Sequence, residues 1–197
     1  RVLFRSSSGN VNFALANGKQ YFENVVFVNS VAGNLTFEGG VSVDNAVNYT
    51  ANNQVITLLS SSSFTGGINL AGYSSSLILD SSSRDVKITS VISSDSPYLA
   101  TISAQGGNNV VFNGDITGNI TIADSTTVQL SDGTDIIGSI SASISNKATL
   151  KMLGSTTVSG TVGATKALKQ ITVGATGSTS SFANTVSAEI GRASCRE

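Results

Sequence analysis

The sequence has no histidine and no tryptophan, one proline, one cysteine and charged residues at only 12% of its 197 positions. Without an imidazole, a serine–histidine–aspartate triad and histidine-built metal sites are excluded. The single proline, Pro97, lies in an expected loop, as befits a chain whose strands are nearly all paired, because proline cannot donate to a sheet ladder. No run of 18 apolar residues is present, so the sequence predicts no transmembrane helix.

Both ends of the chain are expected to be foreign to the rest. Residues 1–6 resemble the translation of a sequencing adapter, and residues 189–197 resemble the translated reverse complement of the paired adapter. A genuine basic tail is the alternative. These two end segments are therefore not expected to belong to the folded domain. We expect one domain over residues 7–188, cut from a longer gene and most regular over 106–188. The only cysteine, Cys195, belongs to the excluded tail, so the remainder cannot form a disulfide.

Charge is sparse and slightly acidic once the ends are removed. Taking four arginines and two glutamates from the 11 basic and 12 acidic residues leaves 7 and 10, a formal net charge of −3. This balance argues against a nucleic-acid partner, which needs a basic stripe. Serine, threonine, asparagine and glycine fill the other polar positions, a composition that suits a long β structure with polar faces and lacks the signature of disorder.

The stretch from Gly118 to Val173 repeats. The tripeptide that begins at Gly118 recurs in similar form at Gly138 and again at Gly160, in two nearly equal steps. A second mark, an apolar-x-apolar triplet, begins at Val128, Leu150 and Ile171. Two interleaved marks that keep one period indicate a solenoid, in which each repeat stacks on the previous one.

The triplets predict short strands, because alternate side chains of a strand face the same side. The sequence therefore predicts an all-β fold, a right-handed parallel β-helix with laps of about 20–22 residues in its second half; the hand follows from the general preference for right-handed crossovers. Triplets at residues 68, 77 and 86 are nine apart, so the first half has three strands per lap or winds less regularly. Residues 55–59 form an apolar run that is expected to be buried on both faces. An antiparallel sandwich is the rival fold.

Several phrases resemble a known family. Residues 106–120, 158–175 and 182–186 are similar to the passenger region of rickettsial surface cell antigens, the outer-membrane protein A and B group of autotransporters. The resemblance covers about residues 106–188; earlier residues share only composition and strand pattern. It implies a passenger exported by type V secretion through a C-terminal β-barrel of the full-length parent, displayed at the bacterial outer membrane and adhesive toward a host cell-surface protein or glycan.

Two other functions stay open. One is a structural stalk, spacer or coat segment, and the other is a carbohydrate-active β-helix enzyme. The close carboxylate pairs for such an enzyme are Asp80 with Asp85 and Asp132 with Asp135, and general acid–base catalysis needs two carboxyls with different pKa values. Residues 132–135 are read more simply as a turn, and the calcium-binding nonapeptide repeat is missing. We therefore expect no enzymatic activity, no cofactor and no catalytic, cofactor-binding or metal residues.

Serine clusters and tyrosines are the remaining candidates for contact with a ligand. The serines at 60–63, 74–76 and 81–83 are expected at solvent-exposed corners, the alternative being a modified or ligand-contacting ridge. Four tyrosines lie near turns, where core or corner packing is expected and presentation to a sugar or protein is the alternative: Tyr21, Tyr49, Tyr73 and Tyr98.

Overall fold

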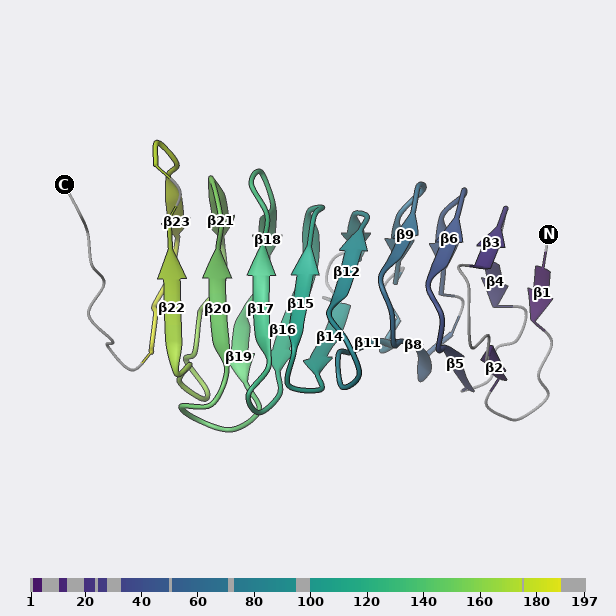
Figure 1. Cartoon of the computed structure of the whole chain (residues 1–197), viewed down its shortest axis with the longest axis horizontal. Helices are drawn as coiled ribbons and strands as arrows, with labels where there is room; N and C mark the ends of the chain where they lie inside the picture. The colour runs from purple at the N-terminus through teal and green to yellow at the C-terminus, as the bar shows by residue number, and fades with distance from the viewer. Residues whose placement is uncertain are drawn as a thin grey trace.

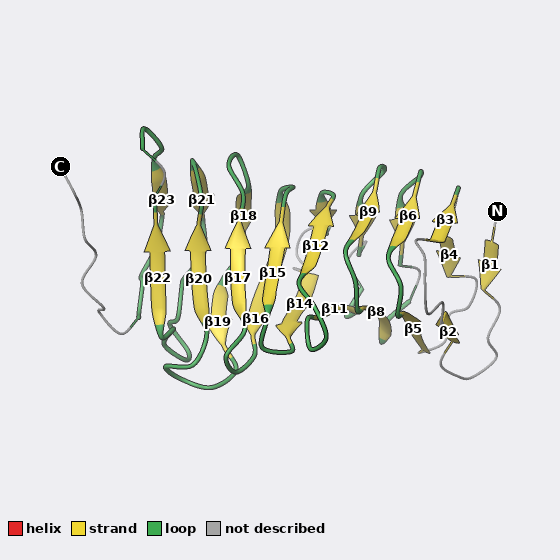
Figure 2. Cartoon of the chain, in the orientation of Figure 1, coloured by secondary structure: helices red, strands yellow, loops and turns green. Residues whose placement is uncertain are grey.

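The computed structural model describes residues 2–4, 11–13, 20–23, 25–27, 33–49, 51–70, 73–94, 100–174 and 176–188. These residues form strands and turns and no helix (Figure 2). Successive turns of the chain stack along one axis, and every named strand pair is parallel (Figure 1). The all-β parallel β-helix is therefore confirmed. The tail 189–197 and the loop around Pro97 lie outside the described residues.

Three faces, A, B and C, follow one another in each turn. Face A contains β1 (Val2–Phe4), β4 (Val25–Phe27), β7 (Val47–Asn48), β10 (Ile68–Asn69), β13 (Ile92–Ser93), the start of β16 (Ile116–Ile122), β18 (Asp135–Ile137), β21 (Thr156–Val158) and β23 (Ser180–Phe182). Face B contains β2 (Val11–Phe13), β5 (Gly33–Phe37), β8 (Gln54–Leu58), β11 (Ser76–Asp80), β14 (Ala100–Gln105), the end of β16 and β19 (Ile140–Ala142). Face C contains β3 (Gln20–Phe22), β6 (Val41–Val43), β9 (Ser62–Phe64), β12 (Val86–Thr89), β15 (Asn109–Phe112), β17 (Thr127–Leu130), β20 (Thr149–Met152) and β22 (Gln170–Val173).

The winding is right-handed. In Figure 1 the chain advances from right to left while the strands of face C, nearest the viewer, run upward and the fainter strands behind run downward. Face C forms an eight-stranded sheet, so from β3 to β22 the chain completes about seven turns.

The repeat read from the sequence is one turn of this solenoid. Ile120 pairs with Ile140, and Ile140 forms a parallel bridge with Val162. The second mark stacks in the same way on face C, through Val128, Leu150 and Ile171. In the first half the triplets near residues 68, 77 and 86 fall in β10, β11 and β12, one on each face, so three strands per turn hold there too.

Turn length varies although the stacking does not. Val110 pairs with Val128 after a short turn, whereas Ser62 pairs with Ile88 after a distinctly longer one. The strands stay short throughout, and the corners between faces take up the difference. The step in residue number therefore changes from turn to turn while each strand still lies over its counterpart.

The core is the column of inward side chains from the three faces. Strands alternate buried and half-buried residues, as in β15, because a strand sends alternate side chains to opposite sides. The expectation that residues 55–59 are buried on both faces is wrong: Ile56 and Leu58 are buried, while Val55 and Thr57 are half-buried on the outer side. A single solenoid has one interior, so the outer side of β8 has no second layer to cover it.

The glycine of the repeat is explained by close contact of successive turns. Gly118, Gly138 and Gly160 stack where face A passes into face B. A Cβ atom on Gly138 would lie 2.0 Å from the carbonyl oxygen of Gly118, and one on Gly160 would lie 2.3 Å from that of Gly138. Backbone meets backbone here, so no side chain fits between the turns.

The serine clusters are only partly exposed, which corrects the sequence expectation. Ser62, Ser75 and Ser81 are buried, whereas their neighbours such as Ser74 are exposed. The Ser75 hydroxyl donates to the carbonyl of Ala51 (2.8 Å) and accepts from the amide of Gln54 (3.3 Å) in the turn below. A buried serine at a corner thus joins two turns where the strand ladders are interrupted.

We expect Ser75→Ala to lower the free energy of unfolding by about 1–3 kcal/mol, because the carbonyl of Ala51 loses a hydroxyl donor inside the fold. Urea unfolding of the purified chain measures this. Ser74→Ala removes an exposed hydroxyl from the same cluster and should change stability by less than about 0.5 kcal/mol. Equal effects of the two substitutions would contradict the bridging role of Ser75.

Candidate functional site

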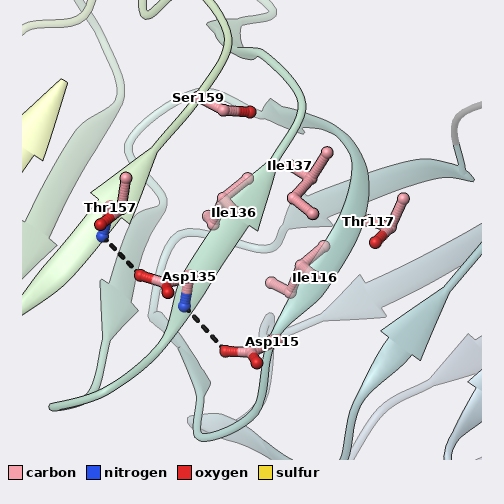
Figure 3. Close-up of a pocket in the computed structure, with 8 residues that line it drawn as sticks. All are labelled: Asp115, Ile116, Thr117, Asp135, Ile136, Ile137, Thr157 and Ser159. Atoms are coloured by element: carbon pink, nitrogen blue, oxygen red, sulfur yellow. Dashed lines mark hydrogen bonds between the residues drawn. The ribbon is translucent and has the colours of Figure 1, made fainter. Parts of the chain in front are cut away.

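A hollow opens on the outer side of face A, in the regular part of the solenoid (Figure 3). It spans three successive turns, contributed by β16, β18 and β21, and has a volume of about 250 Å³. Its lining consists of Asp115, Ile116, Thr117, Asp135, Ile136, Ile137, Thr157 and Ser159. Ile116 and Ile136 are buried and form its floor, so the polar side chains and the 59%-exposed Ile137 form what a ligand would meet.

The carboxylates of this hollow hold the turns together. An oxygen of Asp115 accepts from the amide of Asp135 at 2.9 Å, and an oxygen of Asp135 accepts from the amide of Thr157 at 2.9 Å, as the dashed lines in Figure 3 mark. The Ser181 hydroxyl then donates to the Thr157 hydroxyl at 3.2 Å. The result is a ladder of outward side chains, one rung per turn, spaced by about 4.8 Å.

A second hollow, of about 290 Å³, lies where face A passes into face B. Asn119 and Ser139 line it and repeat the same bonding: the Asn119 carbonyl oxygen accepts from the Ser139 amide (2.9 Å), and the Ser139 hydroxyl accepts from the Thr161 amide (3.1 Å). Its side chains are uncharged. Both hollows present hydroxyl and amide groups on shallow surfaces, which suits hydrogen bonding to an extended ligand.

Asp80 and Asp85, a carboxylate pair flagged in the sequence, lie at a corner between faces B and C. For Asp80, burial raises the pKa, but hydrogen bonds from the Gln105 side chain (3.0 Å) and the Ser82 amide (2.9 Å) outweigh it, so the pKa lies below its usual value. The side chain and the amide of Asn109, each at 3.0 Å, lower the pKa of Asp85. A general acid needs a raised pKa, so neither group fits that role.

Asp132 and Asp135, the other flagged pair, lie at the corner that leads from face C to face A. Asp132 accepts from the amide of Ser155 at 2.7 Å, in the next turn. Asp132 does lie in a turn, as the sequence predicted, but the carboxylates of Asp132 and Asp135 accept hydrogen bonds from the following turn of the solenoid. The two flagged pairs occupy different corners, and the structure does not bring them together. Among the described residues, no group of three or more ligating side chains is placed to hold a metal ion.

The tyrosines divide between the core and the surface. Tyr49 is buried and its hydroxyl donates to the carbonyl of Ser76 at 2.9 Å; burial raises its pKa, although a backbone hydrogen bond opposes the shift. Tyr73 is half-buried against the core. Packing is therefore confirmed for these two, while Tyr21 is 77% exposed on β3 and contradicts it. Tyr98 lies outside the described residues.

Asp85 should make the fold sensitive to acid. Its pKa is lower in the folded chain than in the unfolded chain, so its stabilisation is present above the unfolded pKa of about 3.9 and is lost as the pH falls through the folded value. We expect Asp85→Asn to lower stability near neutral pH by no more than about 1 kcal/mol, because the group is exposed, and to reduce the loss of stability below about pH 4. Urea midpoints measured across this range test it.

A matched control is Asp124→Asn, which alters an exposed carboxylate bonded to the adjacent Ser125 hydroxyl at 3.2 Å. This change leaves the inter-turn bonds of Asp85 in place. If both variants reduce the loss of stability at low pH equally, the contacts of Asp85 with Asn109 are not responsible for the acid sensitivity.

No protein-family model, no curated protein and no solved structure matches the chain. Within the described residues, no helical segment has the length and hydropathy needed to cross a bilayer. Sequence reasoning missed the hollow on face A, since Asp115 and Asp135 lie a full turn apart in the sequence and carry no motif. The available signal was the repeat itself: residues one period apart lie side by side on the outer surface.

Proposed function

We propose that this chain is a segment of a surface-displayed passenger of the autotransporter type, and that it acts in adhesion to host cells at the bacterial surface. The observation that carries the proposal is the outer surface of a continuous stack. About seven turns present successive ladders of hydroxyl, amide and carboxylate side chains to solvent, with shallow hollows rather than a deep cleft. The resemblance of residues 106–188 to rickettsial passengers supports the same reading.

The chemistry of the surface favours binding over catalysis. The chain has no histidine, and the pKa values of Asp80 and Asp85 are shifted away from those of a general acid. Carboxylates such as Asp115 and Asp135 accept amide hydrogen bonds that join turns. A long, rigid side surface gains affinity from many weak contacts, which multivalent display increases further.

Deletion of whole turns from the full-length parent tests adhesion. Bacteria that display the parent with and without residues 116–157 should differ in attachment to host cells, because the deletion removes the hollow on face A and keeps the faces in phase. Surface amount is measured in parallel with an antibody against a remaining part. Equal attachment at equal display would overturn the adhesive role of this part of the chain.

A structural spacer is the second candidate. The bonds that run along the axis, such as Asp132 to Ser155, favour a stiff rod that carries another binding region away from the cell. For a spacer, the same deletion shortens the reach of the parent and leaves the affinity of the purified distal region unchanged. Restoration of attachment by an unrelated solenoid of equal length would favour the spacer over direct adhesion.

A further inference from the structure

Positive charge is confined to one side of the solenoid. The described residues contain six cations: Arg84, Lys87, Lys147, Lys151, Lys166 and Lys169. All six lie on face C or on the corner between faces B and C. The rest of the described surface carries no lysine or arginine, although outward positions exist on every face.

Acidic residues, in contrast, are missing from the last turns of the solenoid. Between Asp135 and Glu189 the sequence contains four lysines and no acidic residue. The last turns are therefore cationic in a chain whose formal net charge is −1, and the acidic residue next to them on the same corner, Asp124, lies in the turn below. Such a local excess of positive charge attracts an anion and speeds its association.

The topology brings these four lysines together. Two successive corner loops, residues 143–148 and 163–169, are neighbours along the axis of the stack at the lower left of Figure 1. The amide of Lys169 donates to the carbonyl of Ala148 (2.8 Å), which places Lys169 one turn from Lys147. At about 4.8 Å per turn and about 3.3 Å per residue, Lys147, Lys151 and Lys169 fall within roughly 15 Å of one another.

Most of this lysine corner, defined as Lys147, Lys151, Lys166 and Lys169, is open to solvent. Lys147, Lys166 and Lys169 are exposed, and Lys151 is half-buried on the outer side of β20. The ammonium group of Lys166 donates to the carbonyl of Ser143, which holds the second loop against the first. The lysines are therefore spread over two exposed loops and one strand, an arrangement that suits an extended polymer better than a small anion.

We propose that the lysine corner binds a linear sulfated polysaccharide. Neutral hydrogen-bonding side chains on the same face accompany the lysines: Thr149, Gln170 and Thr172. A sulfated sugar chain offers both anionic groups for the lysines and hydroxyls for these neighbours. The corner has no arginine and no aromatic ring, the residues that recognise phosphates bidentately and stack on bases, so a nucleic acid fits less well. Three exposed apolar residues lie nearby, Ile144, Leu153 and Val173, and none is aromatic, which is too little for insertion into a lipid surface.

The proposal names the partner chemistry within the adhesive function and rests on that function for its cellular setting. Binding of heparin to the purified full chain tests the chemistry directly. Lys147→Gln/Lys169→Gln should weaken binding roughly tenfold, and exchange of all four lysines should abolish it near physiological ionic strength. Arg84→Gln/Lys87→Gln changes net charge equally outside the corner and should weaken binding less than about twofold. Unchanged thermal unfolding of each variant shows that the fold is intact.

Three results with the purified chain would overturn the proposal: no heparin binding, equal loss in both double variants, or tighter binding of duplex DNA or of anionic phospholipid vesicles than of heparin. Cell attachment separates it from the adhesive function. If the four-lysine variant of the parent attaches as well as the original while deletion of turns prevents attachment, the polysaccharide proposal fails and adhesion stands. If heparin binding depends on the lysines while attachment does not depend on the segment, the adhesive function of the segment fails and the polysaccharide proposal stands.

Discussion

Gly138→Ala should lower the free energy of unfolding by about 3 kcal/mol or more. The new Cβ would lie 2.0 Å from the carbonyl oxygen of Gly118 in the turn below, so one backbone must move. The residue also has φ of +152°, a conformation that L side chains rarely adopt. Urea unfolding followed by circular dichroism measures the loss, and amide exchange should show it concentrated in the turns on either side.

Gly133→Ala is the matched control. This glycine also has positive φ, +73°, but a Cβ there would meet nothing within 4 Å. It should cost only the backbone strain, about 1 kcal/mol. If the two substitutions destabilise the chain equally, close contact between turns does not explain the glycine of the repeat.

Phe112→Ala should destabilise the chain by about 3–5 kcal/mol, because it removes a fully buried ring from the middle of the stack. Each turn contacts mainly its two neighbours, so the cavity weakens coupling between the two halves of the solenoid. Beyond the lower free energy of unfolding, we expect two separated transitions on denaturant unfolding. The control is Val111→Ala on the outer side of the same strand, which should cost less than about 1 kcal/mol. One cooperative transition at the original midpoint would contradict this expectation.

The register of the solenoid could be predicted because its signal is periodic. Ile120, Ile140 and Val162 keep nearly one spacing, and a parallel stack is the arrangement that places such residues over one another. The burial of the corner serines could not be predicted in the same way. Whether Ser74 or Ser75 points inward depends on the path of the chain through the corner, and the composition of a serine cluster carries no information about that path.

The two surfaces of functional interest, the lysine corner and the hollow on face A, could not be predicted from the sequence for a similar reason. The stretch without acidic residues after Asp135 is visible in the sequence. Its lysines lie on the same side of the solenoid because the turn lengths bring Lys147 and Lys169 to the same corner. The hollow on face A likewise depends on the length of the turn between Asp115 and Asp135. Turns in this chain differ in length, as the pairings on face C show, so such neighbours cannot be assigned until each turn is counted.

This tolerance of unequal steps has an evolutionary consequence. Insertions and deletions in an exposed corner loop leave the strand ladders above and below undisturbed, so such changes in length have little thermodynamic penalty. Duplication or loss of a whole lap likewise lengthens or shortens the rod by about 4.8 Å and keeps every other lap in phase. Selection can therefore alter the exposed corner loops of such a protein, and the distance it projects, independently of the buried residues and strand ladders that stabilise the fold.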